Sequence, residues 1–177
     1  MDPIWSNIFR KNPEKDSLAY FLSHLPLFSE LTPKELTLLE SLVHVRNYRA
    51  HDLIFEEGDP GSGMYMIRSG SVYIFSRSPQ GEEEELARLG TGDFFGETTL
   101  TAPAQRSASA RTLEETELVG LFRSDLLEAS KENPRAACHL LFGLTRVMSE
   151  RLQAASLELR QLRNLAGEHA PSETIET

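Results

Sequence analysis

The segment GTGDFFGETTLTAPAQRSASA, residues 90–110, carries the most informative pattern in the chain. It places Gly96-Glu97 and Arg106-Ser107 between two strand-like runs. Glycine lets backbone N–H groups approach an anion closely, and a short helical turn over Thr98 to Thr101 would point its N-terminus at the same place. The planar, permanently charged fork of Arg106 suits two phosphate oxygens. The pattern therefore predicts a small anion pocket.

Glu97 does not fit a pocket that holds only phosphate. Its carboxylate repels an anion, so inside such a pocket we expect it to accept hydrogen bonds from a sugar hydroxyl, as acidic residues do for ribose in dinucleotide folds. An acid close to an arginine is also the commonest surface ion pair. Spacing alone therefore leaves a ligand pocket and an ordinary ion pair as open interpretations.

Residues 43–123, which enclose this segment, consist of short runs of strand-forming residues separated by glycines. Many short strands with glycine turns at near-regular spacing predict an antiparallel β-roll, a jelly-roll-like barrel. Pro79-Gln80-Gly81 predicts a hairpin turn. The acidic run Glu82 to Glu85 that follows is interpreted as a solvated strand start rather than a metal site.

The flanks of the roll have helical periodicity. In residues 1–42, SLAYFLSHLPLF and TPKELTLLESLV carry apolar residues at helical spacing, and Thr32-Pro33 is a typical helix start. Ile4, Trp5, Ile8 and Phe9 predict a further short amphipathic helix, packed on the body or on a partner. Residues 124–168 predict two helices, the second from about Arg135 to Leu165, and 169–177 a disordered tail. The predicted fold class is α+β, an antiparallel β-roll flanked by N-terminal helices and a long C-terminal helix.

An apolar stripe on the last predicted helix recurs at alternating spacings of four and three residues, as in the seam of a short coiled coil. Its members are Met148, Leu152, Ala155, Leu159, Leu162 and Ala166. The stripe favours a homodimer through the C-terminal helix. The alternative is that the same stripe packs on the barrel.

Composition excludes several classes of protein. The chain has 177 residues and a net charge of −9, which gives no general attraction to nucleic acid. No apolar run is long enough to span a membrane and no secretion signal is present, so we expect a cytoplasmic protein without a membrane partner. The lone Cys138 excludes an internal disulfide and Cys-rich metal chemistry, and its setting in AACHLL predicts a small buried core residue. The five histidines lack metal-ligand spacing. We expect no cofactor, no metal and no enzymatic activity.

The segment that begins at residue 90 resembles the phosphate-binding cassette of cyclic-nucleotide-binding domains, which occur in the catabolite activator family, in regulatory subunits of cyclic-nucleotide-dependent kinases and in gated ion channels. Those domains carry an F-G-E motif, a short helix and an R-S-A or similar tripeptide, here Phe95-Gly96-Glu97 and Arg106-Ser107-Ala108. The similarity extends through GDPGSGMYMIRSGSV and LFSELTPKELTLLESLV and covers roughly residues 25–160.

The resemblance implies a role for each cassette residue. Glu97 would bind the ribose 2′-hydroxyl, Arg106 the cyclic phosphate, and Ser107 would add a further contact, with backbone donors near Gly96 to Thr98. By ungapped comparison the purine would lean on Ile74, Leu86 and Ala87, which equally suit plain core positions. The candidates for a base cap on the C-terminal helix are Arg151, Leu152, Ala155 and Ser156.

The chain departs from the family pattern at two places in the cassette. Thr98-Thr99 stands where the family often has an apolar or small pair, and Gln105 where many members have proline. After the C-terminal helix we expect no room for a DNA-binding or other effector domain. The sequence therefore predicts a sensor of cyclic nucleotide, cAMP before cGMP, that acts through its C-terminal helix on a dimer or an unidentified effector protein. The alternative is an interaction domain of the same fold that binds no nucleotide.

Overall fold

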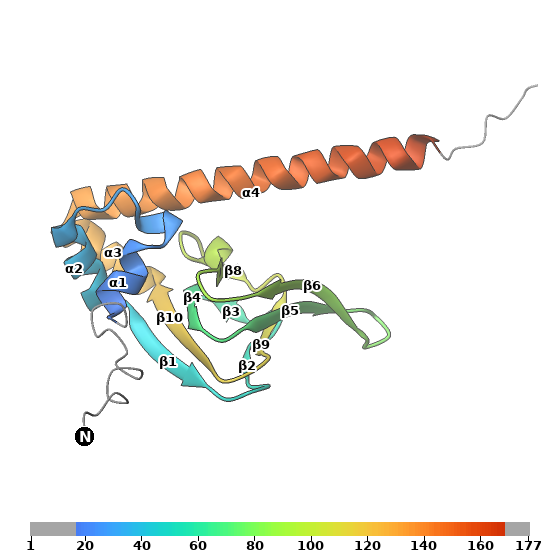
Figure 1. Cartoon of the computed structure of the whole chain (residues 1–177), viewed down its shortest axis with the longest axis horizontal. Helices are drawn as coiled ribbons and strands as arrows, with labels where there is room; N and C mark the ends of the chain where they lie inside the picture. The colour runs from blue at the N-terminus through green and yellow to red at the C-terminus, as the bar shows by residue number, and fades with distance from the viewer. Residues whose placement is uncertain (1–16, 169–177) are drawn as a thin grey trace, which may run out of the picture.

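The computed structural model describes residues 17–168, which fold into helices at both ends and strands between them (Figure 1). The N-terminal helices are α1 (Leu18–Ser23), the 3₁₀ helix η1 (Pro26–Phe28) and α2 (Pro33–Leu42), and the C-terminal helices are α3 (Arg123–Glu132) and α4 (Pro134–Glu168). Between them lie the ten strands β1 (His44–Tyr48), β2 (Leu53–Phe55), β3 (Pro60–Gly61), β4 (Gly63–Ser69), β5 (Val72–Arg77), β6 (Glu83–Leu89), β7 (Phe94–Phe95), β8 (Ala104–Gln105), β9 (Ser109–Thr112) and β10 (Thr116–Phe122) and the short 3₁₀ helix η2 (Glu97–Thr99).

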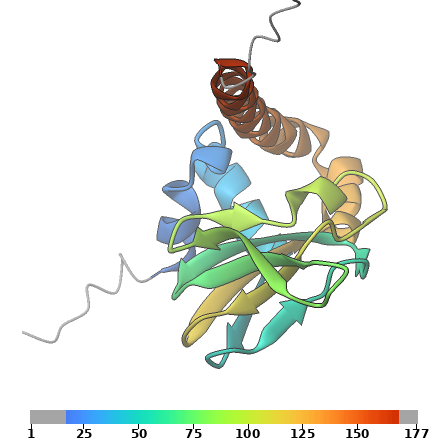
Figure 2. The same ribbon diagram turned by 90° about the vertical axis from the view of Figure 1, so that its right-hand side faces the viewer.

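The strands form two four-stranded antiparallel sheets, in the orders β1-β10-β4-β7 and β2-β9-β5-β6, with a small third sheet of β3 and β8. Figure 2 shows the sheets facing each other, with the blue N-terminal helices to one side of them and α4, orange to red, above them. Inside the roll the buried side chains of Tyr65, Ile67, Val72, Phe95 and Leu118 pack together. This is the antiparallel β-roll with flanking helices that the sequence predicts.

A second core joins the N-terminal helices, α3 and the start of α4 to the first sheet, and Leu22, Phe28, Leu121 and Leu140 are among its buried members. At Gly143 α4 passes so close to η1 that a side chain there would overlap the backbone carbonyl of Leu27. The first half of α4 is therefore held tightly against the N-terminal helices.

The second half of α4 stands clear of both sheets (Figures 1 and 2). Met148 still packs against the helical core, but every residue from Ser149 to Asn164 is exposed. The interpretation in which the whole apolar stripe packs on the barrel is therefore wrong beyond Met148. Ala166 lies in α4, and its side chain is outside the described part of the chain.

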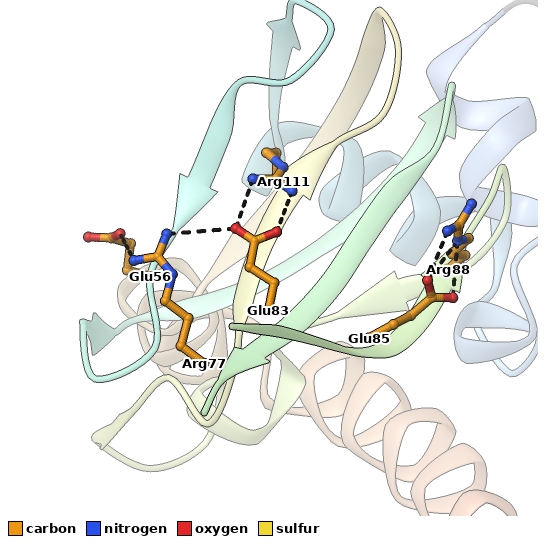
Figure 3. A network of polar contacts seen from close by, with 6 residues as sticks. All are labelled: Glu56, Arg77, Glu83, Glu85, Arg88 and Arg111. Carbon is orange, nitrogen blue, oxygen red and sulfur yellow. Dashed lines mark hydrogen bonds and ion pairs between the residues drawn. The ribbon is translucent and has the colours of Figure 1, made fainter. Parts of the chain in front are cut away.

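Ion pairs cover one face of the sheet that contains β5. Arg111 makes two hydrogen bonds to Glu83, which also pairs with Arg77 at 3.8 Å (Figure 3). Since alternate residues of a strand point to opposite faces, Phe75 under these arginines lies on the face opposite to Ile74. This network belongs to the outer surface of the roll.

Two further expectations lie outside the described residues, namely the helix around Ile4 to Phe9 and the disordered tail 169–177. Cys138 is exposed rather than buried, because Ala136, Ala137 and Leu140 form the core-facing side of α4 at this point. Among residues 17–168, no helix is both long and apolar enough to cross a membrane.

Glu35 ties the start of α2 to α4. Its carboxylate accepts a hydrogen bond from the backbone N–H of Thr32, which completes a capping box, and it lies 3.0 Å from Nδ1 of His139. The Thr32 N–H, followed by the His139 hydrogen bond, lowers the pKa of Glu35 from 4.5 to about 2. The ionised carboxylate is therefore the form that the folded state stabilises.

Acid is consequently expected to weaken the domain through this group. Because the folded pKa of Glu35 is depressed, its contribution to the free energy of unfolding is present above pH 4.5 and is lost as pH falls from about 4.5 towards 2. Glu35→Gln should have a lower thermal midpoint than the unmodified protein at pH 7. The difference between the two midpoints should become smaller as pH falls from about 4.5 towards 2. Melting curves from pH 7 to pH 2.5 that stay parallel for the two proteins would contradict this linkage.

Candidate nucleotide-binding site

A cavity of about 450 Å³ opens between the cassette, the sheet that contains β5 and the middle of α4, within the size range of small-molecule sites. Its lining comprises Phe55, Ile74, Ala87, Leu89, Phe94, Phe95, Gly96, Glu97, Thr98, Arg106, Ser107, Ala108 and Arg151. Ten of the fourteen candidate binding residues from the sequence lie in this lining; Leu86, Leu152, Ala155 and Ser156 do not. The cavity is mostly apolar, with its charged groups at the cassette end.

Arg106 is a buried cation, with 6% of its surface exposed. In residues 17–168 its side chain forms no ion pair, and its hydrogen bonds all come from Nη1, which donates to Gly63 O at 2.8 Å, to Gly96 O at 3.0 Å and to Thr99 Oγ1 at 3.0 Å. Its guanidinium lies 4.1 Å from the ring centre of Phe55. Burial lowers the pKa of Arg106, because the charge loses water, yet an arginine stays protonated in proteins.

The remaining nitrogens of this guanidinium face the cavity. No fully buried side-chain N or O atom in the described residues lacks a hydrogen-bond partner, so Nε and Nη2 of Arg106, which bond to no protein group, must be accessible. A buried cation without a carboxylate is costly unless an anion or fixed dipoles balance it. The site is therefore built to receive an anion.

Backbone bonds fix where Arg106 sits. Its N–H donates to Asp59 O at 2.8 Å and its carbonyl accepts from Gly58 N–H at 2.9 Å, so the glycine-rich turn before β4 forms its socket. Gly96 has a φ of 74°, in the left-handed region that favours glycine, and a side chain there would overlap the guanidinium. The helical turn predicted over Thr98 to Thr101 lies earlier, as η2 over Glu97–Thr99, directly after this glycine.

Glu97 connects the cavity to α4. Its Oε1 lies 3.1 Å from Nη1 of Arg151, whose guanidinium also lies 3.8 Å from the ring centre of Phe94 and donates to Phe94 O at 3.3 Å. The side chain of Glu97 is 13% exposed, and that of Arg151 is 43% exposed. The sequence left two interpretations of Glu97 open, a ligand-pocket residue and an ordinary ion pair. The structure is compatible with both, because Glu97 forms an ion pair and also lines the cavity.

The apolar end of the cavity comes from β5 and β6. Ile74 pairs with Ala87, and both line the cavity. Leu86 does not line it and is 56% exposed: consecutive residues of a strand point to opposite faces, and the register shifts at this residue. Leu89, two residues after Ala87, also lines the cavity.

The candidates for a base cap on α4 separate into two groups. Arg151 reaches the cavity, whereas Leu152, Ala155 and Ser156 are exposed, and the Ser156 hydroxyl donates to Leu152 O at 2.8 Å. Ser156 lies more than one turn beyond Arg151, and α4 has moved away from the roll by then. The structure therefore brings only Arg151 of this group to the site.

Three lining residues were missed by the sequence reasoning, namely Phe55, Leu89 and Phe94. Leu89 could have been found from the two-residue period that starts at Ala87. Phe94 immediately precedes the F-G-E motif. Phe55 lies far from the cassette in sequence, and only the pairing of β2 with β9 brings it near Arg106.

The fold and site define a β-roll ligand-binding domain with an anion pocket, and comparison with known proteins identifies its family. The family model described as "Cyclic nucleotide-binding domain" matches residues 45–133. The chain therefore belongs to the cyclic nucleotide-binding domain family.

The relatives include bacterial regulators and a kinase subunit. The chain is 40% identical over 134 residues to the cyclic AMP receptor protein of Thermus thermophilus, covering 76% of this chain and 60% of that protein. It is 38% identical over 89 residues to a cAMP-dependent protein kinase regulatory subunit of Hypocrea atroviridis, covering 50% and 18%. The crystal structure of the Thermus thermophilus catabolite activator protein superposes with a TM-score of 0.68 at 39% identity, over 78% of this chain and 63% of that chain. The chain thus spans about 60% of the length of the bacterial regulators that it matches.

Proposed function

We propose that this domain is a sensor of a 3′,5′-cyclic purine nucleotide, with cAMP preferred over cGMP, and that it is not an enzyme. The buried Arg106, which forms no ion pair within the described residues and faces a cavity of nucleotide size, carries this proposal. Arg106 binds the cyclic phosphate, Glu97 accepts the ribose 2′-hydroxyl, and Ser107 adds a hydroxyl beside the phosphate. The names of the relatives, which include cAMP receptors and cAMP-dependent kinase subunits, support this ligand class.

The preference for adenine rests on the lining of the other end of the cavity. Ile74, Ala87 and Leu89 offer apolar surface there, and their side chains can hydrogen-bond neither base, so guanine, with a carbonyl oxygen and an amino group, loses more on leaving water than adenine, with one amino group. A buried polar atom left without a partner lowers affinity. Ser107 can meet a guanine amino group, so we expect cGMP to bind more weakly rather than not at all.

We propose that the domain acts in the cytoplasm. We also propose that nucleotide binding is transmitted to a partner through α4. Arg151 of α4 pairs with the carboxylate of Glu97, which the ribose of a bound nucleotide would also contact. The position of α4 and the binding of a nucleotide therefore both affect Glu97. A nucleotide shifts the equilibrium between two positions of α4 only by the difference between its affinities for them. Leu152, Ala155, Leu159 and Leu162 form an exposed apolar stripe on the free half of α4, which suits a second copy of this chain or an effector protein.

Calorimetric titration with cAMP, cGMP and 5′-AMP tests the proposal. We expect binding heat with cAMP, weaker binding with cGMP and none with 5′-AMP, whose open phosphate carries more charge and lacks the cyclic geometry. At a nucleotide concentration of about 100 times Kd, the free energy of unfolding should rise by roughly 2.7 kcal/mol. Sedimentation of the same samples should give twice the chain mass. A folded protein that shows neither heat nor a thermal shift with any nucleotide would favour the interaction domain that binds no nucleotide.

A further inference from the structure

Thr99 is buried completely and does not line the cavity, yet it contacts the group that defines the site. Its hydroxyl oxygen lies 3.0 Å from Nη1 of Arg106, 3.1 Å from Gly96 O and 3.2 Å from Gly63 O. It is one of the two threonines that set this cassette apart from the family pattern. These contacts indicate that Thr99 acts on the site through Arg106.

The Thr99 hydroxyl completes the hydrogen bonding around Nη1 of Arg106. Nη1 carries two hydrogens and meets three acceptors, and the hydroxyl carries one hydrogen and meets two carbonyls. The carbonyls belong to separate segments, Gly63 to β4 and Gly96 to the turn before η2. The Thr99 hydroxyl accepts from the guanidinium, and its single hydrogen lies within reach of both carbonyls, so it closes the cluster around Nη1.

The closed cluster decides which edge of the guanidinium remains for a ligand. Because Nη1 is fully engaged, the edge formed by Nε and Nη2 is the one that can make two parallel hydrogen bonds to a phosphate. Phe55 covers one face of the guanidinium at 4.1 Å and limits its tilt. Rotation about the side chain would break the cluster, so the available edge has a fixed direction.

The side chain of Thr99 also packs closely against β3. A side chain at Gly61 would overlap the Thr99 side chain, so β3 approaches it as closely as a glycine allows. The methyl group and the hydroxyl of Thr99 are both packed against Gly61, but only the hydroxyl bonds to the Arg106 cluster.

We propose that Thr99 is a positioning residue that pre-orients Arg106, so that its Nε and Nη2 edge meets a particular exocyclic oxygen of the cyclic phosphate. This proposal rests on the proposed nucleotide-binding function. Pre-orientation raises affinity because less freedom is lost on binding. It also gives the site a preference between the two exocyclic oxygens.

The test uses Thr99→Val, which keeps the shape and removes the hydroxyl, and Thr99→Ser, which keeps the hydroxyl and removes the methyl group. Affinities are measured for cAMP and for its Sp and Rp phosphorothioates, in which sulfur, a weaker acceptor, replaces one or the other exocyclic oxygen. We expect Thr99→Val to weaken cAMP binding about tenfold, the size of one hydrogen bond to a charged group, and to flatten the preference between Sp and Rp. Thr99→Ser should keep the preference of the unmodified protein.

Thr112→Val is the matched control. Thr112 is also fully buried, and its hydroxyl donates to Arg49 O at 2.6 Å, away from the cavity, so its loss should lower stability without changing the preference between Sp and Rp. The proposal is overturned if Thr99→Val keeps the affinity and preference of the unmodified protein, or if Thr99→Ser loses as much as Thr99→Val. If Thr99→Val does not fold, Thr99→Ala replaces it and is judged by the same preference. Absence of cAMP binding to the unmodified protein would instead contradict the proposed function.

Discussion

Replacing Arg106 by Met is expected to reduce the affinity for cAMP by roughly 30-fold to several-thousand-fold while the domain stays folded. Removal of one partner from a buried, hydrogen-bonded charge pair costs about 2–5 kcal/mol of binding free energy, which corresponds to that range. Met keeps most of the side-chain length and its contact with Phe55, so the loss reports the charge and the fork. Calorimetry with cAMP measures it directly.

The unliganded domain should tolerate this change. Arg106 has no carboxylate partner among residues 17–168, so its removal leaves no buried counter-charge behind, and the hydrogen bonds lost are those to Gly63 O, Gly96 O and Thr99 Oγ1. Arg106→Lys should fall between the two proteins, because a lysine keeps the charge as a point but lacks the planar fork. The thermal midpoint without nucleotide is measured for each variant.

Arg111 offers the matched control for Arg106. It also stacks over an aromatic ring, Phe75 at 4.9 Å, but it lies on the outer face and pairs with Glu83 (Figure 3). Arg111→Met should lower stability slightly and leave the affinity for cAMP unchanged. Binding by Arg106→Met within a few-fold of the unmodified protein would remove the central argument for this site.

The cassette end of the site could be predicted from sequence because it is local. Gly96, Glu97 and Arg106 lie within one short segment, and glycine geometry and arginine chemistry constrain what such a segment can bind. The same reasoning could not supply Phe55 or the socket of Gly58 and Asp59, since strand pairing brings them to Arg106 from distant parts of the chain.

The errors of the sequence reasoning have equally physical causes. Leu86 and Ala87 were both assigned to the base, although neighbours on a strand face opposite ways, and the register shift in β6 decides which one turns inward. On α4, helical periodicity marked the apolar stripe but not where the helix leaves the roll. That point depends on the tight packing at Gly143 and on the direction it imposes on the helix.

Glu97→Gln is expected to weaken cAMP binding by about 10-fold to 150-fold and to leave the weaker binding of 2′-deoxy-cAMP almost unchanged. A hydrogen bond from a ribose hydroxyl to a carboxylate contributes about 1.5–3 kcal/mol, and the deoxy nucleotide cannot form it. In the described residues Oε1 of Glu97 bonds to Arg151 while Oε2 has no protein partner, so the hydroxyl can bind without displacing Arg151.

The comparison of the two nucleotides separates a direct contact from a change of shape. Gln keeps the size of the side chain but loses the charge that holds Arg151, so a general disturbance of α4 would weaken both nucleotides equally. Glu83→Gln, which breaks the ion pairs with Arg111 and Arg77 on the outer face, should change neither affinity. An equal loss for cAMP and 2′-deoxy-cAMP in Glu97→Gln would mean that Glu97 acts through Arg151 and α4 alone, and the ribose would then need another acceptor in the cavity.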